Sequence, residues 1–320
     1  MNNQSNSCTP VSISARSSFL AIALALLLTS TLAAFASNPK GTFDKTFQVN
    51  GPVDLEVQTH SGDIIVRSGP SGSVSIHGKI FVSDRWLFGS DRQADVSEIE
   101  QHPPLRQDGN SIRIDYVNVR DISVDYEITV PADTMLHART GSGNQTIDDI
   151  RGNADLQSGS GDMKLSRLTG EVHVQTGSGN VQAREIAGPV RGGTGSGDIE
   201  VEETAAGDID LHTGSGNITV RGIQGSFHGQ AGSGDITAEG TQTGAWEMRT
   251  GSGNVRVRLP ADAAFDADIM TSSGTLDVNA PITMTVQGRV EERHKQILGK
   301  VRGGGPLLTL RTGSGDIHIE

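Results

Sequence analysis

Apolar and polar residues alternate in short runs along most of this chain, and glycine-rich turns separate the runs. Residues 163–165 are Met-Lys-Leu, and residues 172–174 are Val-His-Val. Alternation with a period of two is typical of a β-strand that buries one face. Each run is too short to bury its apolar face alone, so neighbouring strands must complete a shared core.

The phrase Gly-Ser-Gly-(Asn/Asp) sets the spacing of the turns. From the first copy to the seventh, the spacings are 18, 18, 18, 19, 18 and 19 residues. Self-similarity at a short fixed period predicts a solenoid, and glycine suits sharp corners that need a positive φ. The eight copies occupy residues 141–144, 159–162, 177–180, 195–198, 214–217, 232–235, 251–254 and 313–316.

Equivalent positions of successive coils form apolar ladders when the coils are stacked. Counted from the first glycine of each copy, the fifth, seventh and tenth positions are mostly aliphatic, so we expect them to face the core. The fifth position holds Gln145, Met163, Val181, Ile199, Ile218, Ile236 and Val255. The seventh holds Ile147, Leu165, Ala183, Val201, Val220, Ala238 and Val257, and the tenth holds Ile150, Leu168, Ile186, Thr204, Ile223 and Thr241.

Two positions alternate in charge, and this decides the length of one turn. With 36–37 residues per turn, like charges would stack about 4.8 Å apart, which is destabilising. With 18–19 residues per turn, Asn stacks on Asp and Arg on Glu, so we predict the shorter turn. The alternating residues are Asn144, Asp162, Asn180, Asp198, Asn217, Asp235 and Asn254 at the fourth position, and Arg184, Glu202, Arg221, Glu239 and Arg258 at the eighth.

The sequence therefore predicts an all-β, single-chain β-solenoid of the β-helix or β-roll kind, with either a two-sided or a three-sided cross-section. Irregular end regions fit this fold, because the terminal coils need caps against edge-to-edge aggregation. Residues 286–300 are polar and predict a hairpin excursion or a short helix. The expected boundaries are 40–320 for the domain, 41–140 for N-terminal strands with an irregular cap segment at 78–110, 141–258 for the regular coils, and 259–320 for irregular C-terminal coils and a final strand.

Residues 1–36 have the pattern of a secretory signal peptide. Arg16 supplies the positive charge, residues 19–28 a short apolar core, and the small residues that end at Ala36 a cleavage site. The alternative is an uncleaved signal anchor. Cleavage after Ala36 would remove Cys8, the single cysteine, and leave an exported protein without disulfides. The expected location is the periplasm, the outer envelope or the cell surface.

The formal net charge of −12 excludes two classes of partner. Nucleic acid needs a basic face, and an anionic membrane surface attracts basic segments. We expect neither, and no membrane span remains after signal cleavage. The expected partner is an unknown envelope protein or a surface glycan.

The order of motifs resembles a bacterial family of unknown function that is named "putative adhesin" and consists of β-strand-repeat proteins. The resemblance is carried by a strand at 122–130 leading into Pro131, the repeated Thr-Gly-Ser-Gly-(Asn/Asp), and the closing Leu-Thr-Leu-Arg-Thr-Gly-Ser-Gly-Asp-Ile. It covers residues 45–320 and implies an exported β-solenoid of the envelope or cell surface. It supplies no catalytic residues.

Turn chemistry explains the repeated motif better than a metal or phosphate site does. The phrase is similar to the calcium β-roll nonapeptide, but every second carboxylate is replaced by Asn, and calcium commonly takes carboxylate ligands. Asn and Asp that cap glycine turns through nearby backbone amides explain the pattern better. His173 and His228 are three coils apart and are expected at the surface. Phosphate loops precede helices, whereas these loops precede strands, so no metal or cofactor is expected.

Catalytic chemistry has one candidate cluster. Glu200, Glu202 and Glu203 could supply the carboxylates of a glycan-cleaving β-helix, but a solvated polar face explains them better, so no catalytic residue is expected. Trp86 and Phe88 lie in the segment that departs from the repeat. They are candidate partner contacts, with a cover for the open end of the solenoid as the alternative.

The sequence thus predicts an exported non-enzymatic β-repeat protein, an adhesin or envelope scaffold that binds through outward Thr, Gln, Ser and charged residues. The first alternative is a sensory or regulatory envelope module that works with a membrane partner. The second is a glycan-active β-helix enzyme.

Overall fold

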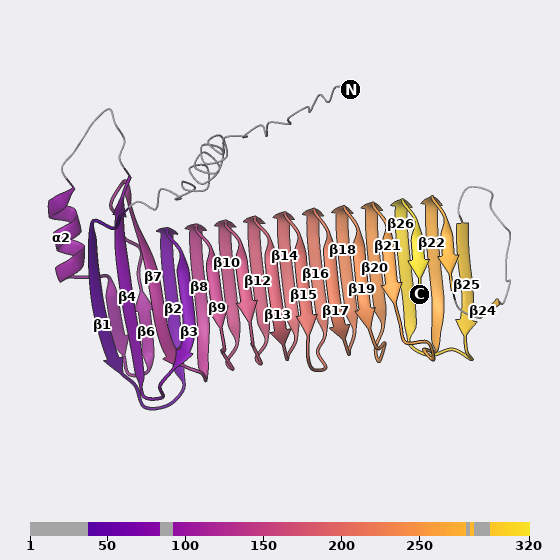
Figure 1. The fold of residues 1–320 in the computed structure, drawn as a ribbon, viewed down its shortest axis with the longest axis horizontal. Helices are drawn as coiled ribbons and strands as arrows, with labels where there is room; N and C mark the ends of the chain where they lie inside the picture. Colours follow the sequence, from indigo (N-terminus) through magenta and orange to yellow (C-terminus); the bar gives the residue numbers. More distant parts are fainter. Residues whose placement is uncertain (1–37, 84–91, 280–281, 285–294) are drawn as a thin grey trace, which may run out of the picture. The chain divides into compact units, whose positions relative to one another are not determined.

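Two long β-sheets that face each other contain most of the described residues (Figure 1). The computed structural model describes residues 38–83, 92–279, 282–284 and 295–320. Residues Pro39–Glu320 form one compact unit. The expected signal peptide at 1–36 and its cleavage site lie outside the described residues, as do Trp86, Phe88 and residues 286–294.

The first sheet, here called sheet A, has 13 strands among the described residues. In spatial order they are β1 (Gly41–Gln48), β4 (Ser73–Val82), β7 (Ile122–Pro131), β3 (Ile64–Gly69), β9 (Gln145–Asp148), β11 (Met163–Ser166), β13 (Val181–Ile186), β15 (Ile199–Glu203), β17 (Ile218–Ile223), β19 (Ile236–Gly240), β21 (Val255–Arg258), β27 (Ile317–Ile319) and β23 (Leu276–Val278).

The second sheet, sheet B, has 14 strands in the same part of the chain. Their order is β24 (Ile282–Met284), β25 (Lys295–Val301), β22 (Phe265–Ser273), β26 (Leu307–Ser314), β20 (Trp246–Ser252), β18 (Phe227–Ser233), β16 (Ile209–Ser215), β14 (Val190–Ser196), β12 (Val172–Ser178), β10 (Ala154–Ser160), β8 (Thr134–Ser142), β2 (Val53–Ser61), β6 (Ser111–Ile114) and β5 (Leu105–Asp108).

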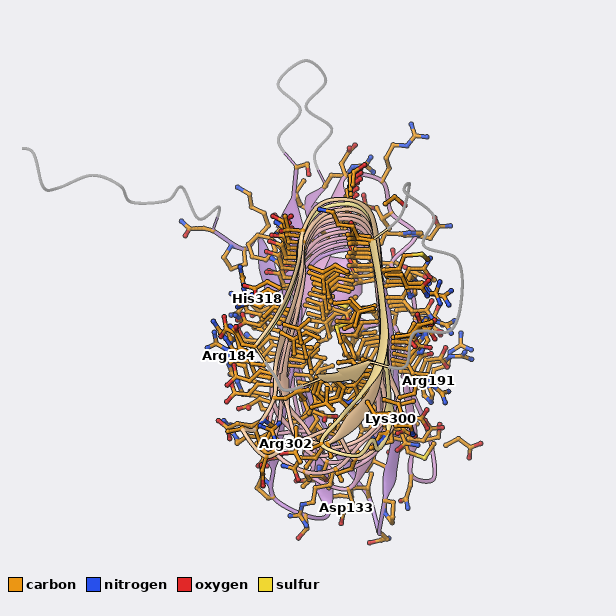
Figure 2. The ribbon with its side chains drawn as sticks, turned by 90° about the vertical axis from the view of Figure 1, so that its right-hand side faces the viewer. Asp133, Arg184, Arg191, Lys300, Arg302 and His318 are labelled. Carbon is orange, nitrogen blue, oxygen red and sulfur yellow. The ribbon has the colours of Figure 1, made fainter. Side chains whose placement is uncertain are left out.

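Each regular coil contributes one strand to each sheet, so the cross-section has two sides (Figure 2). The chain follows β12 in sheet B, turns through a Gly-Ser-Gly arc into β13 in sheet A, and returns by a loop. Val172 pairs in parallel register with Val190, 18 residues later. This confirms the predicted solenoid with 18–19 residues per turn. Glu202, Arg221, Glu239 and Arg258 also stack in register, as predicted.

The core lies between the two sheets and consists of the inward apolar ladders. Val172 and Val174 are buried, whereas His173 between them is exposed. The largest buried side chains are Trp246 and Phe227, whose rings meet edge to face at 6.4 Å. Burial of one such apolar side chain contributes about 1.5–3 kcal/mol, so the stacked coils share a core that no single coil could form.

The two glycines of the motif are required for different reasons. The third residue of the phrase needs a positive φ, which is 151° at Gly197. The first residue has no such φ, but a Cβ on Gly195 would lie 2.6 Å from the carbonyl oxygen of Gly177 in the preceding coil. The sequence predicted the backbone conformation of the corner and not this close approach between coils.

The Asn and Asp side chains of the motif form a ladder that joins the coils. Each side-chain oxygen accepts the backbone N–H of its counterpart in the next coil; Asn180 Oδ1, for example, accepts from Asp198 N at 3.0 Å. The side chains thus bind backbone amides, as expected, but the amide that each one binds lies in the next coil. The ladder runs through Asp125, Asp63, Asn144, Asp162, Asn180, Asp198, Asn217, Asp235, Asn254, Asp316 and Thr275, with distances of 2.7 to 3.0 Å.

In most coils the residue before the motif is a buried Thr or Ser, and its hydroxyl also joins adjacent coils. Thr213 Oγ1 donates to the Gly197 carbonyl at 3.1 Å, and Thr250 Oγ1 to the Gly234 carbonyl at 2.9 Å. The Thr residues at this position are therefore not among the outward Thr that were expected to bind a partner. Period-two alternation turns it inward, where the hydroxyl satisfies a carbonyl of the arc.

The two ends of the solenoid are built from strands inserted out of sequence order. At the N-terminal end, β4 runs antiparallel to both β1 and β7. Helix α2 (Gln93–Gln101) contacts β1 and buries Val96 and Ile99. The described part of segment 78–110 thus holds a helix that the sequence did not predict.

At the C-terminal end, the final coil lies inside the array. Strand β26 pairs with β20 on one side and with β22 on the other, so the coil of residues 307–319 separates two coils that precede it in sequence. In the described part of 286–300, β25 pairs antiparallel with both β22 and β24. This agrees with the hairpin alternative.

Candidate binding face

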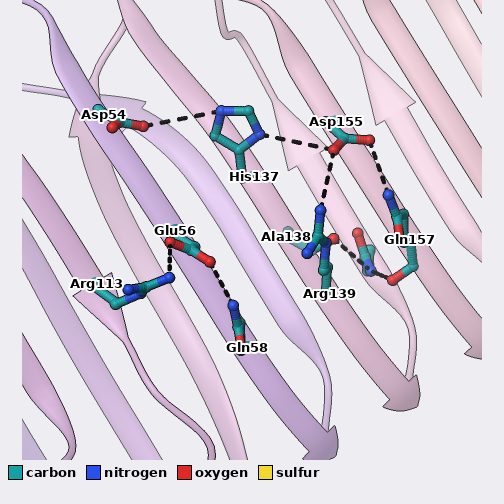
Figure 3. Close-up of polar contacts among 10 residues, drawn as sticks. Asp54, Glu56, Gln58, Arg113, His137, Ala138, Arg139, Asp155 and Gln157 are labelled. Carbon is teal, nitrogen blue, oxygen red and sulfur yellow. Dashed lines mark hydrogen bonds and ion pairs between the residues drawn. The ribbon is translucent and has the colours of Figure 1, made fainter.

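A polar network covers the outer surface of sheet B at the first coils (Figure 3). His137 in β8 lies between two carboxylates, with Nε2 4.0 Å from Asp54 Oδ1 and Nδ1 3.8 Å from Asp155 Oδ2. Arg139 Nη2 reaches the same Asp155 oxygen at 3.8 Å, and Gln157 Nε2 donates to Asp155 Oδ1 at 3.4 Å. These contacts are long and exposed, so they orient the side chains more than they stabilise the fold.

A tighter pair borders this network on β2. Arg113 Nη2 lies 2.6 Å from Glu56 Oε2, and Gln58 also donates to this carboxylate. The hydrogen bond from Arg113 is the main reason that the pKa of Glu56 lies below its usual value. Glu56 is therefore an anion in neutral solution.

Below the network, Gln145 replaces an aliphatic residue of the core ladder. It is fully buried, and its Nε2 donates to the Gln157 carbonyl at 2.7 Å. The sequence correctly placed it at an inward position. Its amide links sheet A to the backbone of β10 at Gln157, whose own side chain is half-buried on the outer face.

A groove of about 550 Å³ crosses β2, β8, β10 and β12 where these strands enter the arc. One wall is a row of three outward side chains at paired positions, namely Arg139, Gln157 and Gln175. The floor is formed by the first motif glycines of three coils, which are Gly141, Gly159 and Gly177. Because glycine has no side chain, the floor consists of backbone atoms alone.

An aromatic pair closes the groove at the first coil. The rings of His60 and Tyr116 stack with centroids 4.5 Å apart and planes 24° apart. His60 occupies the position that is Gly141 in the next coil, since Ser61 and Ser142 are paired. Ser272 in the coil at the opposite end is the other departure from glycine among the described coils. Both residues lie in coils near the ends of the array, where one side of the arc is not covered by a further regular coil of the described chain.

His60 also lines a second hollow, of about 640 Å³. Its other walls are Ser61, Ser83 and residues 117–123. The two hollows thus meet at His60 and offer a surface longer than either one.

The three candidate carboxylates do not form a catalytic cluster. Glu200 and Glu202 point outward, and Glu200 Oε1 lies 2.8 Å from Arg221 Nη1. Glu203 points inward and is 4% exposed. The expectation that all three carboxylates lie on one solvated face is therefore wrong for Glu203. The expectation that Thr204 faces the core is also wrong, because Thr204 is exposed.

A change of register explains the burial of Glu203. Glu185, in the preceding coil, adopts a φ of 55° and lets β13 bulge, so that Ile186 pairs with Glu203. No residue of β15 adopts a positive φ, so this strand continues without a bulge. The inward residue of β15 is therefore Glu203, one repeat position earlier than Ile186 in β13. Neither carboxyl oxygen of Glu203 makes a hydrogen bond of good geometry within the described chain, and burial raises its pKa to about 8.

The remaining expectations concern metals, membranes and partner contacts. Within the ranges that the structure describes, no group of three or more His, Cys, Asp or Glu residues is placed to hold a metal ion. No helix in those ranges has the length and apolar character needed to cross a membrane. His173 and His228 lie on the outer face of sheet B, and His228 approaches Glu247 at 3.5 Å. Trp86 and Phe88 lie outside the described residues.

His60 and Tyr116 were missed at the level of sequence. The available signal was His60 itself, which stands before Ser61-Gly62-Asp63 where the eight intact copies of the motif have glycine. The proximity of Tyr116 could not be predicted, because it depends on the path of the inserted segment between β6 and β7.

The family model described as Toastrack DUF4097 matches residues 37–191 and 190–320. The chain belongs to this Toastrack family. The two matches together span both sheets, so the whole described solenoid is the Toastrack fold. This confirms the resemblance stated from the sequence to a family of unknown function.

Three solved structures align with most of this Toastrack chain. A putative adhesin from Bacteroides fragilis has 13% identity, covers 88% of this chain and 98% of its own, and gives a TM-score of 0.38. One from Parabacteroides merdae has 10% identity, the same coverages and a TM-score of 0.28. A putative cell adhesion protein from Clostridium sporogenes has 9% identity, coverages of 87% and 98%, and a TM-score of 0.23. No curated protein matches the sequence.

Proposed function

We propose that this Toastrack protein is an exported, non-enzymatic binding module of the bacterial envelope or cell surface, with the role of an adhesin or envelope scaffold. The observation that carries the proposal is the groove over Gly141, Gly159 and Gly177, which ends at the His60–Tyr116 pair. A rigid array of paired strands holds its lining side chains at fixed spacings, and such preorganisation favours binding.

The electrostatics of the groove support binding in preference to catalysis. A general acid or base needs a pKa tuned toward neutrality within reach of the bound molecule. The carboxylate with such a pKa is Glu203, and it faces the core instead of the groove. The groove offers donors and acceptors from Arg139, Gln157 and Gln175, which are neither acids nor bases in neutral solution. The imidazole of His60 is the lining group that a catalyst could use, but the described residues that line the groove include no carboxylate to pair with it.

The experiment is capture by native envelopes. The protein would be incubated with envelopes of the producing bacterium, crosslinked, and recovered for mass spectrometry and glycan analysis. In parallel, the release of reducing ends from the envelope polysaccharides would be measured. The proposal expects retention on the envelopes without release of reducing ends.

Three outcomes would contradict the proposal or change it. Accumulation of reducing ends would replace the binding role with a glycan-active enzyme. Enrichment of a single membrane protein would favour the sensory or regulatory alternative. No retention on any envelope fraction would remove the proposal altogether.

A further inference from the structure

We propose that the groove binds a β-1,4-linked glycan, a chain of gluco-configured pyranose rings that lies across strands β2, β8, β10 and β12. This inference rests on the proposed binding function and names its ligand class. The aromatic end, the bare floor and the polar wall each support it.

The aromatic end supplies a stacking surface. His60 stacks on the Tyr116 ring, and Tyr116 remains 42% exposed while lining the groove. The face of an aromatic ring carries negative partial charge. Gluco-configured pyranoses have all-equatorial substituents, so their axial C–H groups form an apolar face with positive partial charge. Such a ring therefore fits against Tyr116.

The floor allows a flat chain to approach closely. Gly141, Gly159 and Gly177 are exposed and stacked in register. A Cβ on Gly159 would lie 2.5 Å from the Gly141 carbonyl oxygen, so the stacking of coils itself keeps this surface free of side chains. An extended β-1,4-linked chain has the matching flat shape.

The wall offers both donors and acceptors at a regular spacing. Arg139 donates, and the amides of Gln157 and Gln175 both donate and accept. Paired strands place them about 4.8 Å apart. Sugar hydroxyls also donate and accept, whereas a phosphate or carboxylate ligand would need donors alone. The mixed wall therefore favours a polyol over an anion.

A peptide fits this groove less well. An extended peptide gains most of its affinity by adding to a free sheet edge. Strands β8, β10 and β12 are each paired on both sides, so no edge is open here. The groove also runs across these strands and lacks the row of apolar pockets that would select peptide side chains.

The test is calorimetric titration of the full chain with cellohexaose and with chitohexaose. At least one should bind, and Tyr116→Ala should weaken that binding about tenfold, the loss expected for one stacked ring. Tyr116→Phe should keep the affinity within about twofold, because stacking needs the ring and not the hydroxyl. His212→Ala is the matched control, an exposed residue on β16 outside the groove, and should change nothing.

Each contrary outcome is informative. Absence of binding by both hexasaccharides overturns the ligand class, and unchanged affinity in Tyr116→Ala overturns the site. If the wild-type protein is still retained by native envelopes in either case, the proposed binding function survives and only this inference fails. Loss of a crosslinked envelope protein in Tyr116→Ala, with no hexasaccharide binding, would assign the groove to a protein partner.

Discussion

Asn254 in the last regular coil accepts the backbone N–H of Asp316 at 2.8 Å, although 62 residues separate them. The neighbour of Asn254 along the ladder is therefore the final motif and not the worn copy at Thr275, which follows it in sequence. Asp316 Oδ1 in turn accepts from Thr275 N at 2.8 Å. The inserted coil preserves the alternation, since an Asp follows the Asn.

The alternation of Asn and Asp has a physical reason that predicts the effect of breaking it. Asn180 Nδ2 donates to Asp162 Oδ1 at 3.3 Å, besides the backbone bond. Asn180→Asp would remove this donor and place three carboxylates in a row. We expect a loss of about 1 kcal/mol in the free energy of unfolding at pH 7, measured by urea denaturation.

The loss in Asn180→Asp should shrink at high salt and at pH 4, because screening and protonation both relieve repulsion. Asp198→Asn is the control, since it keeps the acceptor and adds no charge. A loss that is equal at every salt concentration would show that repulsion is not the cause.

Glycine at the first motif position is required by the neighbouring coil. Gly195→Ala would place a methyl group 2.6 Å from the Gly177 carbonyl oxygen. Forcing the coils apart should cost about 1–3 kcal/mol, measured as a lower thermal unfolding midpoint. Ser196→Ala, at the exposed next residue, should change stability by less than about 0.5 kcal/mol. Equal midpoints for the two variants would contradict the proposed crowding.

One coil lacks the hydroxyl that joins it to its neighbour. Ala231 stands in the buried row occupied by Thr213 and Thr250, so the matching Gly216 carbonyl lacks this donor. Ala231→Thr should stabilise the protein by about 1 kcal/mol in urea denaturation. Ala231→Val adds similar volume without the donor and should not stabilise. If both variants destabilise, the core near Phe227 has no room for the larger side chain.

Glu203 predicts a pH dependence of stability. Burial is the main reason that its pKa rises to about 8, with a further increase from Asp208 and a partial offset from the backbone amide of Gln224. The folded state therefore holds a proton that the unfolded state releases near pH 4.5. The stability should be highest below pH 4.5 as far as this group is concerned, and should fall as the pH rises from there to about 8.

Glu203 should therefore lower the free energy of unfolding at pH 7 by about 3 kcal/mol relative to its value at pH 4.5. Glu203→Gln should remove this slope, and Glu203→Ile should restore the aliphatic ladder and raise stability at pH 7. Glu202→Gln, at the exposed neighbour, should leave the slope unchanged. Unfolding midpoints measured from pH 5 to pH 8.5 test this, and a slope that persists in Glu203→Gln would contradict it.

The regular coils were predictable because the same sequence pattern is repeated in each of them. Period-two alternation gave the inward positions of Met163 and Leu165, and the charge pattern gave the turn of 18–19 residues. The register at Glu203 was not predictable, because it depends on whether one backbone residue adopts a positive φ, as Glu185 does. The inserted final coil and the approach of Tyr116 to His60 were equally hidden, since both are contacts between segments far apart in sequence.

The most direct test of the account is co-sedimentation of the protein with native envelopes, comparing wild type, Tyr116→Ala and His212→Ala. The account predicts that wild type and His212→Ala pellet with the envelopes, that Tyr116→Ala stays largely in solution, and that all three unfold at the same temperature. If Tyr116→Ala pellets as well as the wild type does, the groove at the first coil is not the binding face, and the account is wrong at its centre.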